Sequence, residues 1–159
     1  MGYCIGCPDI PAFVDGYGRY VADVLERPGS EVVRPADVSS QRAPRSLEDG
    51  SVNGVSLEQQ AWNPRWLLVE GNEKVIEEDK YRATMHINLS DGWRGQGWGR
   101  KLIESFVEAV KAQKQADTRG IWIGVAGDNS KVVAFYEKLG FRVRERVGEG
   151  TIRMVRDLD

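Results

Sequence analysis

The chain has 159 residues, of which 41% are hydrophobic and 29% are charged, and its formal net charge is -2. This length and composition predict a single globular domain over residues 1–159. The slightly acidic balance argues against a dedicated DNA-binding protein. The lack of a long apolar run or of a basic, apolar leader argues against a membrane or secreted protein. We therefore expect a cytoplasmic or nucleocytoplasmic protein.

The first third of the chain predicts a strand, a helix and a long loop. Residues 3–7 are a short strand candidate that ends at Pro8. Apolar side chains then recur at helical spacing over residues 13–25, and Pro28-Gly29 end the helix. Residues 30–54 are rich in Ser, Pro, Arg and Asp, so we expect a long loop there.

Cys4 and Cys7 form a lone C-x-x-C pair. A structural zinc site needs a second pair of Cys or His ligands, which this sequence does not supply. Residues three apart in a strand also point to opposite faces. We therefore expect two free thiols and no metal.

Residues 62–79 allow two interpretations. The two apolar runs on either side of Gly71 could form a hairpin with a Gly-containing turn. They could equally form a helix with a kink at that glycine. We favour the helix.

The second half of the chain begins with a strand, a helix and a strand. Residues 83–89 alternate small or apolar side chains with polar ones, which is strand periodicity. An apolar stripe then predicts a helix of about sixteen residues that ends before Asp117. Residues 121–126 are an uninterrupted apolar run, typical of a central strand that is covered on both faces.

The chain closes with a helix and two strands. Asn129 is a candidate cap for a helix that carries an apolar stripe, and Gly140 is a typical residue for ending it. Residues 141–147 and 151–155 predict two strands around a glycine-containing turn.

A glycine-rich loop joins the strand at 83–89 to the following helix. Its sequence, Arg94-Gly95-Gln96-Gly97-Trp98-Gly99-Arg100, contains the pattern R-x-x-G-x-G. The first amides of a helix have no intrahelical partner, and glycines let the backbone approach an anion closely. The spacing matches neither the dinucleotide fingerprint nor the nucleoside-triphosphate loop. The loop alone is therefore either a phosphate site, whose ligand it does not name, or a plain tight turn.

Two motifs together resemble the GNAT superfamily of acetyl-CoA-dependent N-acetyltransferases. Residues 94–99 fit that family's Q/R-x-x-G-x-G/A loop, and residues 129–141 resemble its segment that ends in F-Y-E-K-L-G-F. The resemblance covers the core at residues 83–143. It implies an α/β (α+β) fold with a mixed, mostly antiparallel twisted sheet, a central pair of splayed parallel strands, and flanking helices.

The resemblance implies that acetyl-CoA is the cosubstrate and that no metal takes part. The pyrophosphate would lie on the loop amides. The pantetheine arm would lie between the splayed strands at 85–89 and 121–126 and form strand-like hydrogen bonds with them. The expected cofactor-binding residues are Ile87, Asn88, Leu89, Arg94, Gly95, Gln96, Gly97, Trp98, Gly99, Arg100 and Asn129.

Two residues are candidates for catalysis. Tyr136 matches the tyrosine that protonates the CoA thiolate in many relatives, and a core aromatic is the alternative interpretation. His86 is the single histidine and a candidate base, although a lone histidine on a strand is more often structural. Many relatives carry a glutamate on this strand, but residues 83–89 have none. A neutral amine or a chain of waters could then replace a side-chain base.

The N-terminal part allows two alignments with the family. In one, residues 3–7 are the first strand and residues 66–78 form the hairpin. In the other, which we favour, residues 2–13 and 81–89 are similar to the acetyltransferase-like domain attached to some O-GlcNAc hydrolases. The family's first strands and helices would then be missing from this chain.

The sequence thus predicts an N-acetyltransferase that passes an acetyl group from CoA directly to an amine. The acceptor could be a small amine, an amino sugar or a peptide amine. Neither DNA nor a membrane is expected as a partner, and a homodimer stays open. The alternative is a catalytically silent CoA-binding module that keeps the fold for interaction.

Overall fold

The computed structural model describes residues 1–32, 34–35, 43–114, 117–148 and 150–158. The chain divides into two compact units, one formed by residues 1–10 and 73–159 and the other by residues 11–72. The sheet belongs to the first unit. That the two units form one domain stays a prediction.

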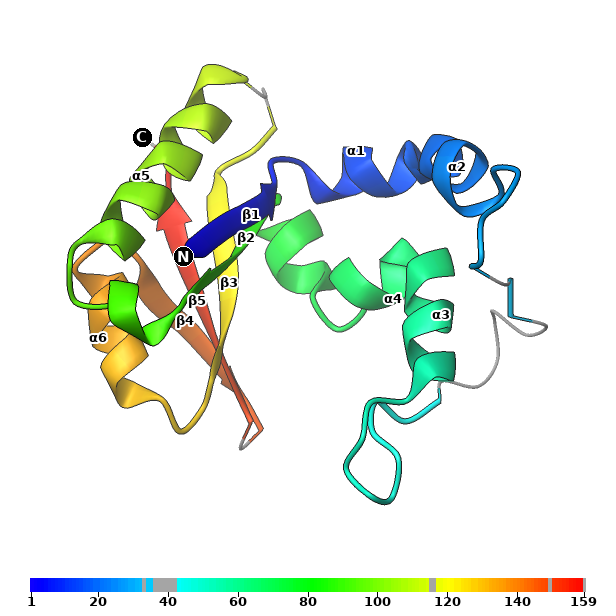
Figure 1. The fold of residues 1–159 in the computed structure, drawn as a ribbon. Helices are drawn as coiled ribbons and strands as arrows, with labels where there is room; N and C mark the ends of the chain where they lie inside the picture. Colours follow the sequence, from blue (N-terminus) through cyan, green and yellow to red (C-terminus); the bar gives the residue numbers. More distant parts are fainter. Residues whose placement is uncertain (33, 36–42, 115–116, 149, 159) are drawn as a thin grey trace. The chain divides into compact units, whose positions relative to one another are not determined.

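The first unit is built on a five-stranded sheet with the order β1-β2-β3-β5-β4 (Figure 1). The pair β2–β3 is parallel, and the other neighbours are antiparallel. This is the mixed, mostly antiparallel sheet that the sequence predicted. The strands are β1 (Gly2–Cys7), β2 (Ala83–Leu89), β3 (Gly120–Ala126), β4 (Arg142–Val147) and β5 (Thr151–Asp157).

Two helices, α5 (Trp98–Ala112) and α6 (Ser130–Glu137), cover one face of this sheet (Figure 1). Both match the predicted helices. The apolar stripe of α5 packs against alternate residues of β2, β3 and β5, because a strand presents every second side chain to one face. The fully buried members of this core include Ile103, Val107, Ile121, Ile152 and Met154.

The parallel pair is short. Ala83 lies opposite Ile121 and Thr84 opposite Trp122, and the pairing between β2 and β3 ends at Thr84. Beyond this point β2 keeps pairing with β1 up to Leu89, while β3 keeps pairing with β5 up to Ala126. The two central strands therefore separate toward their carboxyl ends, as the predicted splay requires.

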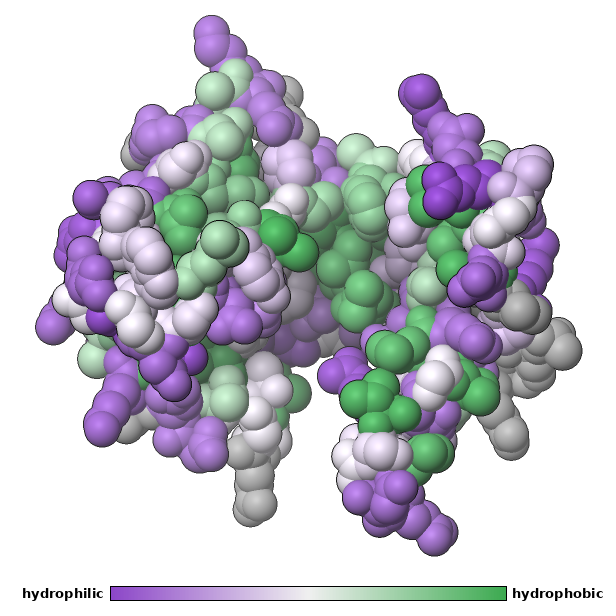
Figure 2. Space-filling view, viewed as in Figure 1, coloured by the Kyte–Doolittle hydropathy of each residue, from purple (hydrophilic) through white to green (hydrophobic). Residues whose placement is uncertain are grey.

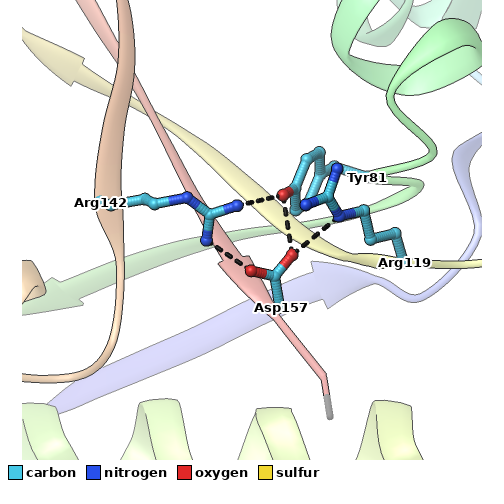
Figure 3. A network of polar contacts seen from close by, with 4 residues as sticks. All are labelled: Tyr81, Arg119, Arg142 and Asp157. Carbon is cyan, nitrogen blue, oxygen red and sulfur yellow. Dashed lines mark hydrogen bonds and ion pairs between the residues drawn. The ribbon is translucent and has the colours of Figure 1, made fainter.

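A polar network holds the opposite, closed end of the strands together (Figure 3). The Tyr81 hydroxyl donates to Asp157 Oδ1 at 2.8 Å, and Arg119 Nε donates to the same oxygen at 2.9 Å. Arg142 bonds both Asp157 and the Tyr81 hydroxyl. Tyr81 precedes β2, Arg119 precedes β3, Arg142 begins β4 and Asp157 ends β5. One carboxylate thus ties four strand ends.

The second unit is helical. The predicted helix over residues 13–25 is confirmed as three consecutive segments, α1 (Ile10–Asp15), α2 (Tyr17–Tyr20) and the π-helix η1 (Val21–Leu25). Two further helices follow, α3 (Gly54–Trp62) and α4 (Pro64–Leu68).

Residues 62–79 are helical, and the hairpin interpretation is wrong. The helix α4 is followed by Gly71, whose φ is 76°, and by the π-helix η2 (Lys74–Glu78), which belongs to the first unit. Glycine adopts a positive φ without steric cost, so the chain bends there as the helical interpretation anticipated. A short 3-10 helix, η3 (Asp91–Trp93), follows β2.

The predicted loop over residues 30–54 is described only in part, because residues 33 and 36–42 lie outside the described residues. Within the described part, the loop has no helix or strand before α3 begins at Gly54. A bridge between Ser46 and Val52 closes a small turn.

Apolar side chains lie at the surface of the second unit (Figure 2). Among its described residues, Leu25 and Val69 are the buried large apolar side chains, whereas a larger set is exposed. No helix in the described part of the chain is long and apolar enough to cross a membrane. The exposed set includes Leu47, Val52, Val55, Leu57 and Leu67.

We expect Asp157→Asn to lower the free energy of unfolding at pH 7 by roughly 1 to 2 kcal/mol, because it weakens charge-assisted hydrogen bonds that solvent partly screens. The hydrogen bond from Arg142 holds the pKa of Asp157 below its ordinary value. Its contribution is therefore full above the unfolded-state pKa of about 3.9 and is lost as the pH falls through the lower folded-state pKa.

Urea unfolding across pH 3 to 7 measures this effect. The difference between wild type and Asp157→Asn should shrink toward acid. Glu108→Gln, at an exposed carboxylate on α5, is the control and should change stability little at any pH. A difference that stays constant with pH would contradict the assignment of the network to the ionised carboxylate.

Candidate functional site

A groove of about 560 Å³ lies on the helix-covered side of the first unit, where β2 and β3 separate. It is walled by the end of β2, the glycine-rich loop, the start of α5 and one side of α6. Ten of the predicted site residues line it, from segments far apart in the chain. They are Ile87, Asn88, Leu89, Arg94, Gly95, Gly97, Gly99, Arg100, Asn129 and Tyr136.

Two residues of the groove were not predicted. Val132 and Phe135 of α6 line it beside Tyr136. The sequence did hold the signal, because Val132 lies four residues before Tyr136 and the two therefore share a helix face. Phe135 is adjacent to Tyr136, and their rings meet edge-on with centroids 5.3 Å apart.

The loop glycines have different physical reasons to be glycine. Gly95 and Gly97 have φ values of 74° and 82°, and a Cβ on either would meet nothing within 4 Å. Backbone conformation therefore selects glycine at these positions, and the space above them stays open. A Cβ on Gly99 would instead lie 3.2 Å from the Phe135 ring and 3.4 Å from Leu89. Gly99, expected to let the loop curl, serves close helix packing.

The N-terminus of α5 has no side-chain cap. Gly97 occupies the cap position and offers no side-chain acceptor. In contrast, α3, α4 and α6 each begin at an asparagine whose side chain accepts a backbone N–H, namely Asn53, Asn63 and Asn129. The first amides of the longest helix are therefore left for another acceptor, and the helix dipole favours an anion there.

Two arginines border these amides. Arg94 Nε donates to the Leu89 carbonyl at 2.9 Å, which anchors its guanidinium at the end of β2, and its Nη1 lies 2.9 Å from Asp91. Arg100 lies 3.6 Å from Glu104 one turn along α5. Both side chains are more than half exposed, so each can turn toward an anion in the groove.

Gln96 and Trp98 are not among the residues that line the groove, and their predicted role, through the loop amides, stays a prediction. Gln96 Nε2 donates to the Gly92 carbonyl at 2.7 Å and so braces the loop. The Trp98 ring meets Trp93 edge-on at 5.9 Å and lies under the Lys101 ammonium at 4.6 Å. In the described structure these side chains hold the shape of the loop.

Asn129 begins α6. Its Oδ1 accepts the Val132 N–H at 3.3 Å, so this oxygen already caps the helix. The residue still lines the groove. Its amide NH₂ group is the part that could donate to a ligand.

Tyr136 belongs both to the core and to the groove. The side chain is 9% exposed and packs against the Phe141 ring at a centroid distance of 5.5 Å. Burial raises the pKa of its phenol, and the nearby Cys4 raises it further. The hydroxyl therefore keeps its proton at neutral pH, as a proton donor must.

His86 lies outside the groove. It is exposed and pairs with Ile5 of β1. Its neighbours on β2, Met85 and Ile87, pack toward the core beneath α5, so strand alternation places His86 on the other face. The Tyr3 ring lies 6.1 Å from the imidazole ring, measured between centroids.

Cys4 and Cys7 are free thiols. Burial raises the pKa of both. The Cys4 thiol contacts the Met85 sulfur at 3.8 Å, and the side chain packs against the core. Among the residues that the structure describes, no three His, Cys, Asp or Glu side chains gather as metal ligands would.

The model of the acetyltransferase (GNAT) domain family matches residues 65–143, which include the loop, the groove and Tyr136. A curated relative, an uncharacterized N-acetyltransferase of Methanocaldococcus jannaschii, is 30% identical over 113 residues. The chain belongs to the GNAT superfamily. The crystal structure of SsHAT is similar to 99% of this GNAT chain, with a TM-score of 0.69 and 25% sequence identity.

This GNAT chain spans only part of the length of these two relatives. The match covers 69% of the chain but 46% of the Methanocaldococcus protein, so the chain spans about half of that relative's length. It covers 66% of the SsHAT chain. The similarity to the acetyltransferase-like domain of O-GlcNAc hydrolases stays a prediction.

If the uncapped start of α5 binds phosphates, millimolar inorganic pyrophosphate should raise the thermal unfolding midpoint by mass action. Gly97→Glu should remove this rise, because the substitution places an anion beside the amides and forces a side chain into a positive φ.

Differential scanning fluorimetry with and without pyrophosphate measures both effects. Gly150→Glu adds the same charge at a glycine whose surroundings are equally open, in the turn between β4 and β5, and should keep the rise. Equal shifts in the Gly97 and Gly150 variants would place the anion elsewhere.

Proposed function

We propose that this GNAT chain is an acetyl-CoA-dependent N-acetyltransferase that transfers acetyl directly to a primary amine. One observation carries the proposal. A single groove contains the uncapped start of α5, the end of β2 beyond its pairing with β3, and the buried hydroxyl-bearing ring of Tyr136. These are the partners that a diphosphate, an amide-containing arm and a thiolate leaving group require.

The cofactor's polar groups find complementary partners along this groove. The diphosphate would accept hydrogen bonds from the first amides of α5, with Arg94 and Arg100 adding positive charge. Ile87, Asn88 and Leu89 have no strand on the β3 side, so their backbone groups can pair with the amides of the pantetheine arm. The amide NH₂ of Asn129 would donate to the same arm.

In the transfer step, the nitrogen lone pair of the amine attacks the thioester carbonyl. The tetrahedral intermediate collapses with cleavage of the C–S bond, and the departing CoA thiolate takes the proton of Tyr136. Solvent then reprotonates the tyrosinate. A thiol has a pKa of about 8.5 and a free phenol of about 10, and burial raises the pKa of Tyr136 further, so the transfer is uphill and depends on a hydrogen bond that leads into it.

The amine must lose a proton as well. His86 is our candidate for accepting it through water, because it lies on the face opposite the groove and would meet an acceptor arriving from that side. Since β2 carries no glutamate, His86 and the phenol of Tyr136 are the titratable groups that we assign to the reaction.

The first test is binding and turnover of acetyl-CoA. We expect acetyl-CoA to raise the thermal unfolding midpoint more than pyrophosphate does, because the arm adds contacts along β2. Free thiol should then be released in proportion to amine in an acceptor panel. Binding without thiol release would favour the silent CoA-binding module, and the absence of any shift at millimolar acetyl-CoA would overturn both functions.

We expect Tyr136→Phe to lower kcat by about 100-fold or more, the usual effect of losing a positioned acid, while the KM for acetyl-CoA changes little. Phe135→Leu, at the neighbouring groove residue without a proton to give, is the control. A Tyr136→Phe enzyme with unchanged kcat would show that the phenol packs the core and takes no part in proton transfer.

A further inference from the structure

The face of the sheet that points away from α5 and α6 carries a row of aligned residues across all five strands. Ile5 pairs with His86, Gly124 with Arg153, and Arg153 with Glu145. Thr84 pairs with Trp122, and His86 and Gly124 each lie two residues further along their parallel strands. His86 and Gly124 therefore stand opposite each other across the splay, just past its closed end.

Gly124 leaves a gap in this row. The residue is exposed, and a Cβ added to it would meet a single neighbour, Thr151 Cγ2, at an ordinary 3.8 Å. Its φ lies outside the range that favours glycine, so neither backbone conformation nor crowding requires glycine there. Glycine is also disfavoured in strands. A residue that costs stability without a structural reason points to a function for the empty space.

The gap lies close to the reacting centre of the proposed function. Val125, next to Gly124, belongs to the same core cluster as Tyr136, which lines the groove on the helix-covered face. Because β2 and β3 are unpaired at this level, a slender group can pass between them. An acceptor nitrogen arriving over Gly124 would have the exposed His86 imidazole on one side.

The charges around the gap favour a cation. Asp79, at the end of η2, forms an ion pair with Arg144 of β4, which places η2 beside this face. The exposed charged residues of η2 are two acids, Glu77 and Glu78, and one base, Lys74. The side chains of Asp79 and Glu145 are 27% and 31% exposed, whereas those of Arg144 and Arg153 are 17% and 15% exposed. Within these two ion pairs the carboxylates are therefore more exposed than the guanidinium groups.

The carboxylate of Glu145 stays charged at neutral pH. A hydrogen bond from Arg153 at 2.8 Å lowers its pKa, and Arg144 and Lys74 act in the same direction. On the other side of the gap, Tyr3 and Ile5 are 48% and 61% exposed. Carboxylates on one side and apolar surface on the other suit an ammonium group on an aliphatic chain.

We propose that Gly124 determines acceptor specificity by leaving a passage across the sheet for an unbranched aminoalkyl chain. Such chains occur in polyamines and in lysine side chains, and bulky amino sugars would not fit through a gap of one missing side chain. The inference rests on the proposed acetyl transfer, which supplies the reaction at the far end of the passage.

Gly124→Val tests the passage. Valine suits a strand and removes the entropic cost of glycine, so the variant should be as stable as the wild type or more stable. We expect its KM for an aminoalkyl acceptor to rise at least about tenfold, with the KM for acetyl-CoA and the thermal shift by acetyl-CoA unchanged. Gly124→Ala should give an intermediate KM and guards against misfolding of the valine variant.

The matched control is Gly150→Val, which adds the same side chain at an open glycine in the turn after β4. It should leave both KM values unchanged. The acceptor panel contains a linear diamine, a lysine-containing peptide and glucosamine. Preference for the diamine assigns the passage to free polyamines, and preference for the peptide assigns it to lysine side chains.

Two outcomes would overturn the inference. One is an active wild type that prefers glucosamine, and the other is a stable Gly124→Val enzyme with an unchanged acceptor KM. A wild type that neither binds nor turns over acetyl-CoA fails at the earlier step and overturns the proposed function itself. The two failures are therefore distinguishable in a single set of assays.

Discussion

The architecture of this GNAT chain depends on the early separation of its only parallel strand pair in the described structure. Ala83 and Thr84 pair with Ile121 and Trp122, and the two strands then diverge. Each central strand keeps its outer partner, so the sheet stays intact while backbone groups of both strands face the gap. A fold normally avoids unpaired strand edges. Under the proposed function, the pantetheine arm of acetyl-CoA would complete the exposed edge.

The closed end of the strands makes this separation possible. The buried Tyr81 ring and the Asp157 carboxylate bring the ends of β2, β3, β4 and β5 together on one side of the sheet. The core beneath α5, with Ile103 and Ile121 fully buried, holds the same region from one face. Fixed at one end, the central strands can part at the other without loss of register. The polar network and the groove thus lie at opposite ends of the same strands.

Most strands and helices of the first unit could be predicted from the sequence, because their apolar residues recur with the period of a strand or of a helix. The alternation at 83–89, the apolar run at 121–126 and the stripe of α5 each gave the observed element. The roles of Gln96, Trp98 and Gly99 could not be predicted, since they depend on contacts with Gly92, Trp93 and Phe135 that no spacing reveals. Residues 62–79 were ambiguous because a glycine with positive φ suits a hairpin turn and a helix break alike.

Glycine serves three separate purposes around the splay, and the distinction matters for interpreting such motifs. Gly97 is required by a left-handed backbone that exposes the amides of α5. Gly99 is required by the approach of Phe135. Gly124 satisfies neither condition, and it lies outside both motifs that identify the family. The family motifs include Gly97 and Gly99 but not Gly124. Under the proposed function, Gly124, the position with no conformational or packing reason for glycine, is therefore the one that would report on the acceptor.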